Sequence, residues 1–98
     1  MSRVIFTISY EIIPDRRGDY LPLSQKMKEY ILQKGGVTDY SVYEDKRKRN
    51  SFTEVFTFNS MEQYNGLEDE DESMQNFMTL LESMLVGGKM KYTTLVEV

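Results

Sequence analysis

The stretch at residues 52–60, FTEVFTFNS, alternates aromatic side chains with small or β-branched ones. Successive side chains of a strand point to opposite faces, so Phe52, Phe56 and Phe58 share one face. At Ser60 the alternation stops, and Ser60 and Gln63 have the spacing of a helix-capping box. We therefore predict a strand over residues 52–59 at the centre of a sheet, with helices covering its aromatic face and a short helix beginning at Ser60.

Two longer helices are predicted from apolar residues at helical spacing. The first begins after Asp19, a good N-cap that leaves Pro22 in the first turn, and ends at the Gly35–Gly36 pair. The second occupies the region between residues 74 and 88 and ends at a second glycine pair. Its apolar side consists of Met74, Phe77, Met78, Leu81 and Leu85.

Alternation also predicts strands over residues 3–13, 38–44 and 90–98. The resulting order, β-α-β-β-α-β, is the ferredoxin-like pattern of an α+β protein. Right-handed crossovers place both helical layers on one face of a single antiparallel sheet. We expect the 98 residues to form one domain, residues 1–98.

The sheet face that the helices leave uncovered has an unusual composition. It carries Ile5, Ile13, Tyr43, Val55 and Leu95, which are too apolar for water, among threonines that are unusually polar for a core. Two identical sheets pressed together across a two-fold axis would bury such a face. We therefore predict a homodimer that forms through this sheet face.

Composition disfavours several classes of function. The net charge of −4 argues against nucleic acid and membrane partners, and the basic run at residues 46–49 is best interpreted as a solvated hairpin tip. The absence of cysteine suits the cytoplasm, and no long apolar run suggests secretion or a membrane span. Without histidine, cysteine or a glycine-rich phosphate loop, we expect no haem, flavin or metal cofactor.

The chain resembles the antibiotic-biosynthesis-monooxygenase-like domains of the dimeric α/β-barrel superfamily. The resemblance rests on the strand end at residues 13–15 (IPD), the Gly35–Gly36 stop before a strand, and the strand-to-helix passage FTFNSME at residues 56–62. It implies two ferredoxin-like subunits whose sheets form a shared barrel, with a small pocket between sheet and helices in each. Relatives of this kind include cofactor-free oxygenases of quinols and polyketides, haem-degrading enzymes, isomerases and proteins without known activity.

The haem-degrading branch of this superfamily carries an Asn, a Trp and a His at three positions. Within a residue or so, those positions correspond here to Ile8, Phe58 and Leu67, which are all apolar. The resemblance therefore does not extend to haem degradation.

Aromatic and sulfur-containing side chains make an apolar pocket the main candidate site. Such side chains are polarizable and suit a flat apolar ligand, although a plain packed core, with methionines filling the gap between the helices, needs the same residues. The predicted pocket residues are Phe6, Ile8, Phe56, Phe58, Leu67, Phe77 and Met78.

Four polar residues are candidates for catalysis. Tyr10 and Tyr64 would lie at the rim of the pocket, and Asn59 at the strand-to-helix turn could orient a substrate or simply form the turn. Glu54 shares its face with three phenylalanines, where a raised pKa would suit a general base. In the alternative interpretation its carboxylate lies near an edge and reaches water or a lysine. The acidic segment at residues 68–72 lacks the spacing of a calcium loop and is better explained as favourable charge before a helix N-terminus.

Two functions remain open at the level of sequence. The first is cofactor-independent oxygenation of a quinol or another small aromatic, in which the electron-rich substrate supplies the reducing power. The second is a non-catalytic dimer of the same fold that binds a small ligand or has a structural role. Fold alone does not choose between them.

Overall fold

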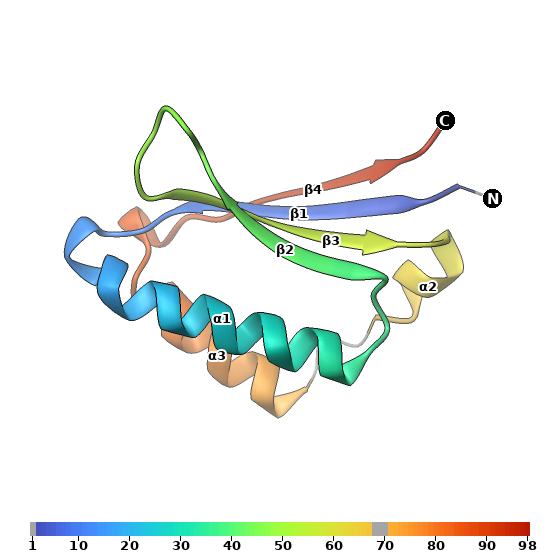
Figure 1. Cartoon of the computed structure of the whole chain (residues 1–98), viewed down its shortest axis with the longest axis horizontal. Helices are drawn as coiled ribbons and strands as arrows, with labels where there is room; N and C mark the ends of the chain where they lie inside the picture. Colours follow the sequence, from blue (N-terminus) through green and yellow to red (C-terminus); the bar gives the residue numbers. More distant parts are fainter. Residues whose placement is uncertain (1, 68–70) are drawn as a thin grey trace.

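The computed structural model describes residues 2–67 and 71–98. Four strands form one antiparallel sheet in the order β2-β3-β1-β4, and α1 and α3 lie together on one of its faces (Figure 1). The predicted ferredoxin-like α+β fold is therefore confirmed. The elements are β1 (Val4–Glu11), α1 (Arg17–Lys34), β2 (Asp39–Glu44), β3 (Ser51–Phe58), α2 (Met61–Asn65), α3 (Glu72–Glu82) and β4 (Lys91–Val96), with short 3-10 turns at Pro14–Arg16 and Val86–Gly88.

The aromatic strand lies in the interior of the sheet, as predicted. β3 pairs with β2 on one side and with β1 on the other, and Phe6 of β1 stands opposite Phe56 of β3. Every second residue of β3 from Phe52 onward is buried, and the residues between are only half-buried. This alternation selects the face that the helices cover.

The long helix α1 packs its predicted apolar stripe on that face. Tyr20, Leu23, Met27 and Ile31 are buried, and Tyr30 is half-buried between α1 and α3. After α1, Gly35 and Gly36 both take positive φ angles, 81° and 84°, which glycine adopts without strain. At the start of α2, the Ser60 hydroxyl accepts a hydrogen bond from the Gln63 N–H (3.1 Å), so the predicted cap is present.

The predicted start of α1 at Asp19 is wrong. Pro14 begins a 3-10 turn that passes directly into α1, so the helix starts at Arg17 and Pro22 lies inside it. Asp19 lies in the first turn, where its carboxylate forms an ion pair with Arg16 (3.0 Å) and favours the positive end of the helix dipole. Pro22 has no N–H to donate to the carbonyl one turn earlier in the helix. Because Pro22 is exposed, water can reach that carbonyl instead.

The predicted extent of α3 is also wrong at its C-terminal end. The helix ends at Glu82, and Leu85 forms a β-bridge with Ile12 instead of continuing the helical stripe. The Ile13 N–H donates to the Met84 carbonyl (2.8 Å), which ties the chain after α3 to the end of β1. Sheet pairing therefore overrides helical periodicity there.

Two charged segments lie at the surface. In the basic tip at residues 46–49, the backbone N–H groups of Arg47 and Lys48 donate to the Asp45 carboxylate, which gives an exposed turn. Of the acidic stretch, residues 68–70 lie outside the described part, and Asp71 caps α3 by accepting the Ser73 N–H (2.8 Å). Within the described residues, no helix has the length and apolar character needed to cross a membrane.

Phe58 offers a test of how firmly this core is packed. Its side chain is fully buried, so Phe58→Ala should lower the free energy of unfolding by about 3–5 kcal/mol in urea denaturation. Leu21→Ala, on the exposed side of α1, is the control and should change stability by less than about 0.5 kcal/mol. Similar losses for the two variants would contradict this account of the core.

Candidate functional site

A cavity of about 460 Å³ opens between the sheet and the helices. Its sheet side is formed by Phe6 and Ile8 of β1, Phe56 of β3 and Tyr92 of β4, which lie on the inner face. In Figure 1 α2 lies apart from α3, and both helices contribute to the lining, with Tyr64 and Asn65 from α2 and Met74 and Met78 from α3. The volume of the cavity is in the range of small-molecule sites.

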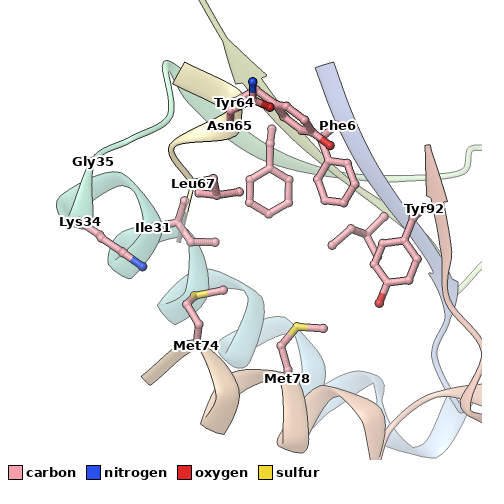
Figure 2. A pocket seen from close by; sticks show the side chains of 12 residues that line it. Phe6, Ile31, Lys34, Gly35, Tyr64, Asn65, Leu67, Met74, Met78 and Tyr92 are labelled. Atoms are coloured by element: carbon pink, nitrogen blue, oxygen red, sulfur yellow. The ribbon is translucent and has the colours of Figure 1, made fainter. Parts of the chain in front are cut away.

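The two sides of the cavity offer different apolar surfaces. Phe6 stacks with Tyr92, with ring centroids 6.1 Å apart and planes inclined by 16°, and lies 5.7 Å from Phe56. Figure 2 shows Met74 and Met78 of α3 across the cavity from these rings. A flat apolar ligand placed between them would meet aromatic faces on one side and thioethers on the other.

The polar side chains of the lining are those of Lys34, Tyr64, Asn65 and Tyr92. The Tyr64 hydroxyl is hydrogen-bonded to Thr94 Oγ1 (3.2 Å). The Lys34 Nζ lies 3.1 Å from Asp71, and hydrogen bonds from Tyr30 and Lys34 lower the pKa of that carboxyl to about 2. The Lys34–Asp71 pair joins the end of α1 to the start of α3 beside the cavity.

Five of the seven predicted pocket residues line this cavity: Phe6, Ile8, Phe56, Leu67 and Met78. The other two predicted residues, Phe58 and Phe77, do not line it. Phe58 is fully buried beneath Tyr64, whose ring is 5.3 Å away and nearly perpendicular, and Phe77 turns toward Tyr30 of α1 (5.6 Å).

Sequence reasoning missed several lining residues. Ile31 and Tyr92 could have been found, because one ends the apolar stripe of α1 and the other shares the strand face of Phe6 once the register is known. Met74 was considered only as a residue that fills the gap. Lys34 and Asn65 carry no signal in the sequence that points to this position.

The four catalytic candidates occupy three different places. Tyr64 lines the cavity, and Asn59 is exposed at the turn, where its backbone N–H donates to Gln63 Oε1 (2.7 Å). Tyr10 does not reach the predicted pocket rim and instead lies buried near Glu54, since α1 covers that part of the sheet.

Glu54 is buried, so the alternative interpretation, in which its carboxylate reaches water or a lysine, is wrong. Only 1% of the residue is exposed, and Oε1 accepts a hydrogen bond from the Tyr40 hydroxyl (2.7 Å). The Tyr10 hydroxyl is hydrogen-bonded to that of Tyr20 from α1 (2.7 Å). We call Glu54, Tyr10, Tyr20 and Tyr40 the carboxyl–tyrosine cluster.

Burial dominates the electrostatics of this cluster. It raises the pKa of Glu54, and the nearby hydroxyls of Tyr40 and Tyr10 oppose the effect only in part. Burial, and then the charge of Glu54, raise the pKa values of Tyr10 and Tyr40 above the ordinary range of a phenol. Glu54 Oε2 is buried and has no hydrogen-bond partner among the described residues.

Metal-ligating side chains do not gather in the described part of the chain. No group of three or more histidine, cysteine, aspartate or glutamate residues there could hold a metal ion.

The opposite pKa shifts of two glutamates predict opposite pH dependences. Because the folded-state pKa of Glu54 is raised, its contribution to stability is present below the unfolded-state value of about 4.3 and is lost as pH rises through the folded-state value. The glutamine of Glu54→Gln stays neutral at every pH. We therefore expect the free energy of unfolding of this variant, relative to that of wild type, to increase as pH rises from 4 to 8, measured by urea denaturation.

Glu44 serves as the matched control with the opposite sign. The Arg17 guanidinium and then the Asn50 N–H lower the pKa of Glu44 to about 2, so its contribution is present above about pH 4.3 and is lost as pH falls toward 2. Glu44→Gln should therefore cost more stability at pH 7 than at pH 3. A Glu54→Gln effect that is constant with pH would contradict the assigned shift.

Comparisons with known proteins place the chain by its fold. No family model matches the sequence, and no curated protein matches it. Among solved structures, a conserved protein from Methanosarcina mazei superposes with a TM-score of 0.84 at 15% identity, covering 97% of this chain and 92% of that one.

Two further structures carry informative names. One is named antibiotic biosynthesis monooxygenase (TM-score 0.73, 16% identity, 100% of this chain and 97% of that one). The other is SnoaB, a cofactor-independent oxygenase from Streptomyces nogalater (TM-score 0.76, 9% identity, 95% of this chain and 90% of that one). At these identities the likeness establishes the fold, and the chain therefore has the fold of the antibiotic biosynthesis monooxygenases.

Proposed function

We propose that the chain is a small homodimeric oxygenase that acts without a cofactor on a quinol or another electron-rich aromatic. The observation that carries the proposal is the cavity between aromatic rings and thioethers, in which few of the lining side chains are polar. Such a cavity holds a flat aromatic ring by its faces and leaves a few hydroxyls to orient it. The fold shared with SnoaB, which is named a cofactor-independent oxygenase, supports the same reading.

In this reaction the substrate supplies the electrons. With an anthrone as substrate, the ring CH₂ between the two aromatic rings reacts with dioxygen to give a C=O group and one molecule of water. One oxygen atom forms the new carbonyl and the other leaves as water, so the substrate carbon is oxidised and dioxygen is reduced. The protein excludes water from the ring and orients the reacting carbon.

A second candidate is ligand binding without turnover. It is favoured by the chemistry of the cavity wall: among the described lining residues, the titratable side chains are Lys34, Tyr64 and Tyr92, and none is a carboxylate or an imidazole. The two candidates make the same prediction for binding and differ only for oxygen consumption.

Oxygen uptake with anthrones and quinols, measured beside thermal-shift binding, separates these candidates. We expect wild-type protein to accelerate uptake, and Met78→Trp, which fills the cavity from α3, to abolish both binding and uptake. Leu80→Trp places the same ring on the exposed side of α3 and should leave both intact. Binding without uptake would favour the second candidate, and the absence of both would contradict the proposed site.

Dimer formation is proposed from the outer face of the sheet. In Figure 1 α1 and α3 lie on the opposite face, and Ile5, Tyr43 and Leu95 of the outer face are 37%, 60% and 54% exposed. Thr57 and Leu95 also border a shallow hollow there. A second copy of this face would cover these side chains. The predicted cytoplasmic location belongs to the same proposal.

Light scattering tests the dimer directly. Wild-type protein should have the mass of a dimer at micromolar concentration, and Thr57→Lys should give a monomer or an unfolded chain, because an unpaired charge in such an interface is costly. Gln25→Lys adds the same charge on the exposed side of α1 and should remain a dimer. A wild-type monomer would contradict the proposal.

A further inference from the structure

The carboxyl–tyrosine cluster lies beside the sheet side of the cavity, on the same inner face of the sheet. Ile8, which lines the cavity, is the cross-strand partner of Glu54, and Phe56, which also lines it, is the next inward residue along β3. Cross-strand partners have Cβ atoms about 4.5–5.5 Å apart. The Glu54 side chain is therefore adjacent to that of Ile8 and borders the cavity lining without being part of it.

Glu54 also has one oxygen that is not held as firmly as the other. Oε1 accepts a hydrogen bond from Tyr40, whereas Oε2 is buried and has no hydrogen-bond partner within hydrogen-bonding distance among the described residues, although the nearby Tyr10 hydroxyl acts on the same carboxyl. An ionised carboxylate would leave an acceptor unpaired there, and a protonated one could leave a donor unpaired, so either state costs free energy. A hydrogen-bonding group delivered from the cavity would remove this cost.

The surroundings of Glu54 favour a neutral hydrogen-bond donor, and not an anion, as the ligand group that pairs with Oε2. The Tyr40 hydroxyl donates to its carboxylate, and Tyr10 and Tyr20 carry hydroxyls that share a hydrogen bond. No cation is among the groups that act on the carboxyl, whose pKa burial raises, so the carboxylate is more basic than usual. A neutral hydroxyl can approach such a group, whereas an anionic ligand would be repelled.

We propose that Glu54 recognises the ligand hydroxyl: Oε2 accepts the proton of a phenol whose ring lies against Ile8 and Phe56. The inference rests on the proposed function, because it uses the same cavity. The contact requires the Glu54 side chain to turn toward Ile8. In the structure its Oε1 is held by the hydrogen bond from the Tyr40 hydroxyl (2.7 Å).

During oxygenation the same contact becomes a proton transfer. The O–H bond of the phenol breaks, a new O–H bond forms at Oε2, and the electron pair stays on the ligand oxygen. The total charge of the site does not change, because ionised Glu54 becomes neutral as the phenol becomes a phenolate. The phenolate is richer in electrons and reacts more readily with dioxygen, and Glu54 is then a catalytic residue.

Two ligands that differ only in the hydroxyl, each measured against wild type and a Glu54 variant, test the contact. We would measure dissociation constants of 2-naphthol and its methyl ether, 2-methoxynaphthalene, by isothermal titration for wild type and Glu54→Gln. In wild type, 2-naphthol should bind about 10-fold or more tightly than the ether, because the site loses a hydrogen bond to a charged group when the hydroxyl is blocked. In Glu54→Gln the preference should shrink, because the neutral amide oxygen still accepts a hydrogen bond but a weaker one than the carboxylate does.

Control variants separate this contact from a general effect on the fold. Glu62→Gln removes an exposed carboxylate on the neighbouring α2 and should keep the wild-type preference. Glu54→Leu replaces the carboxylate with an apolar side chain and should lose the preference, which gives a second test if the glutamine variant does not fold.

The remaining outcomes overturn the inference. Equal preference in wild type and both Glu54 variants would show that Glu54 does not contact the hydroxyl, while the cavity and the proposed function would stand. Loss of the preference in Tyr64→Phe, with Glu54→Gln unaffected, would assign recognition to the rim. Failure of either ligand to bind wild type would overturn the inference and the proposed site together.

Discussion

The structure depends on the antiparallel pairing of β1 with β3 in the middle of the sheet. This register puts Phe6 opposite Phe56 and Ile8 opposite Glu54, and it directs all four side chains toward the helices. A shift by one residue would turn the aromatic face to the outside and place threonines under α1. The core, the cavity and the buried carboxyl are therefore consequences of one strand register.

The fold was largely predictable from the sequence because strand alternation and helix stops are local signals. The Phe52–Phe58 alternation identified the central strand, and the glycine pair after α1 identified the helix end. The errors lie where distant contacts act. Leu85 left the helical stripe because it pairs with Ile12, and α1 began early because the turn at Pro14 leads straight into it.

The candidate site was predictable only in part, for the same reason. Strand alternation placed Phe6, Ile8 and Phe56 correctly, but it could not show how far each helix extends over the sheet. Glu54 illustrates the limit: its face was known, whereas its burial depends on α1 bringing Tyr20 over that end of the sheet, close to Phe52 (ring centroids 4.4 Å). No local pattern encodes that contact.

The inner face of the sheet is thus divided between two environments. Toward one end, α1 packs closely and buries the carboxyl–tyrosine cluster; toward the other, α2 and α3 leave the cavity open. A carboxyl in such a core costs stability unless it is fully hydrogen-bonded, and an apolar residue at position 54 would pack there without that cost. The boundary between the two environments runs between Glu54 and its partner Ile8, so this costly group lies where a ligand can come closest to it. That placement connects the electrostatics of the core to the chemistry of the cavity.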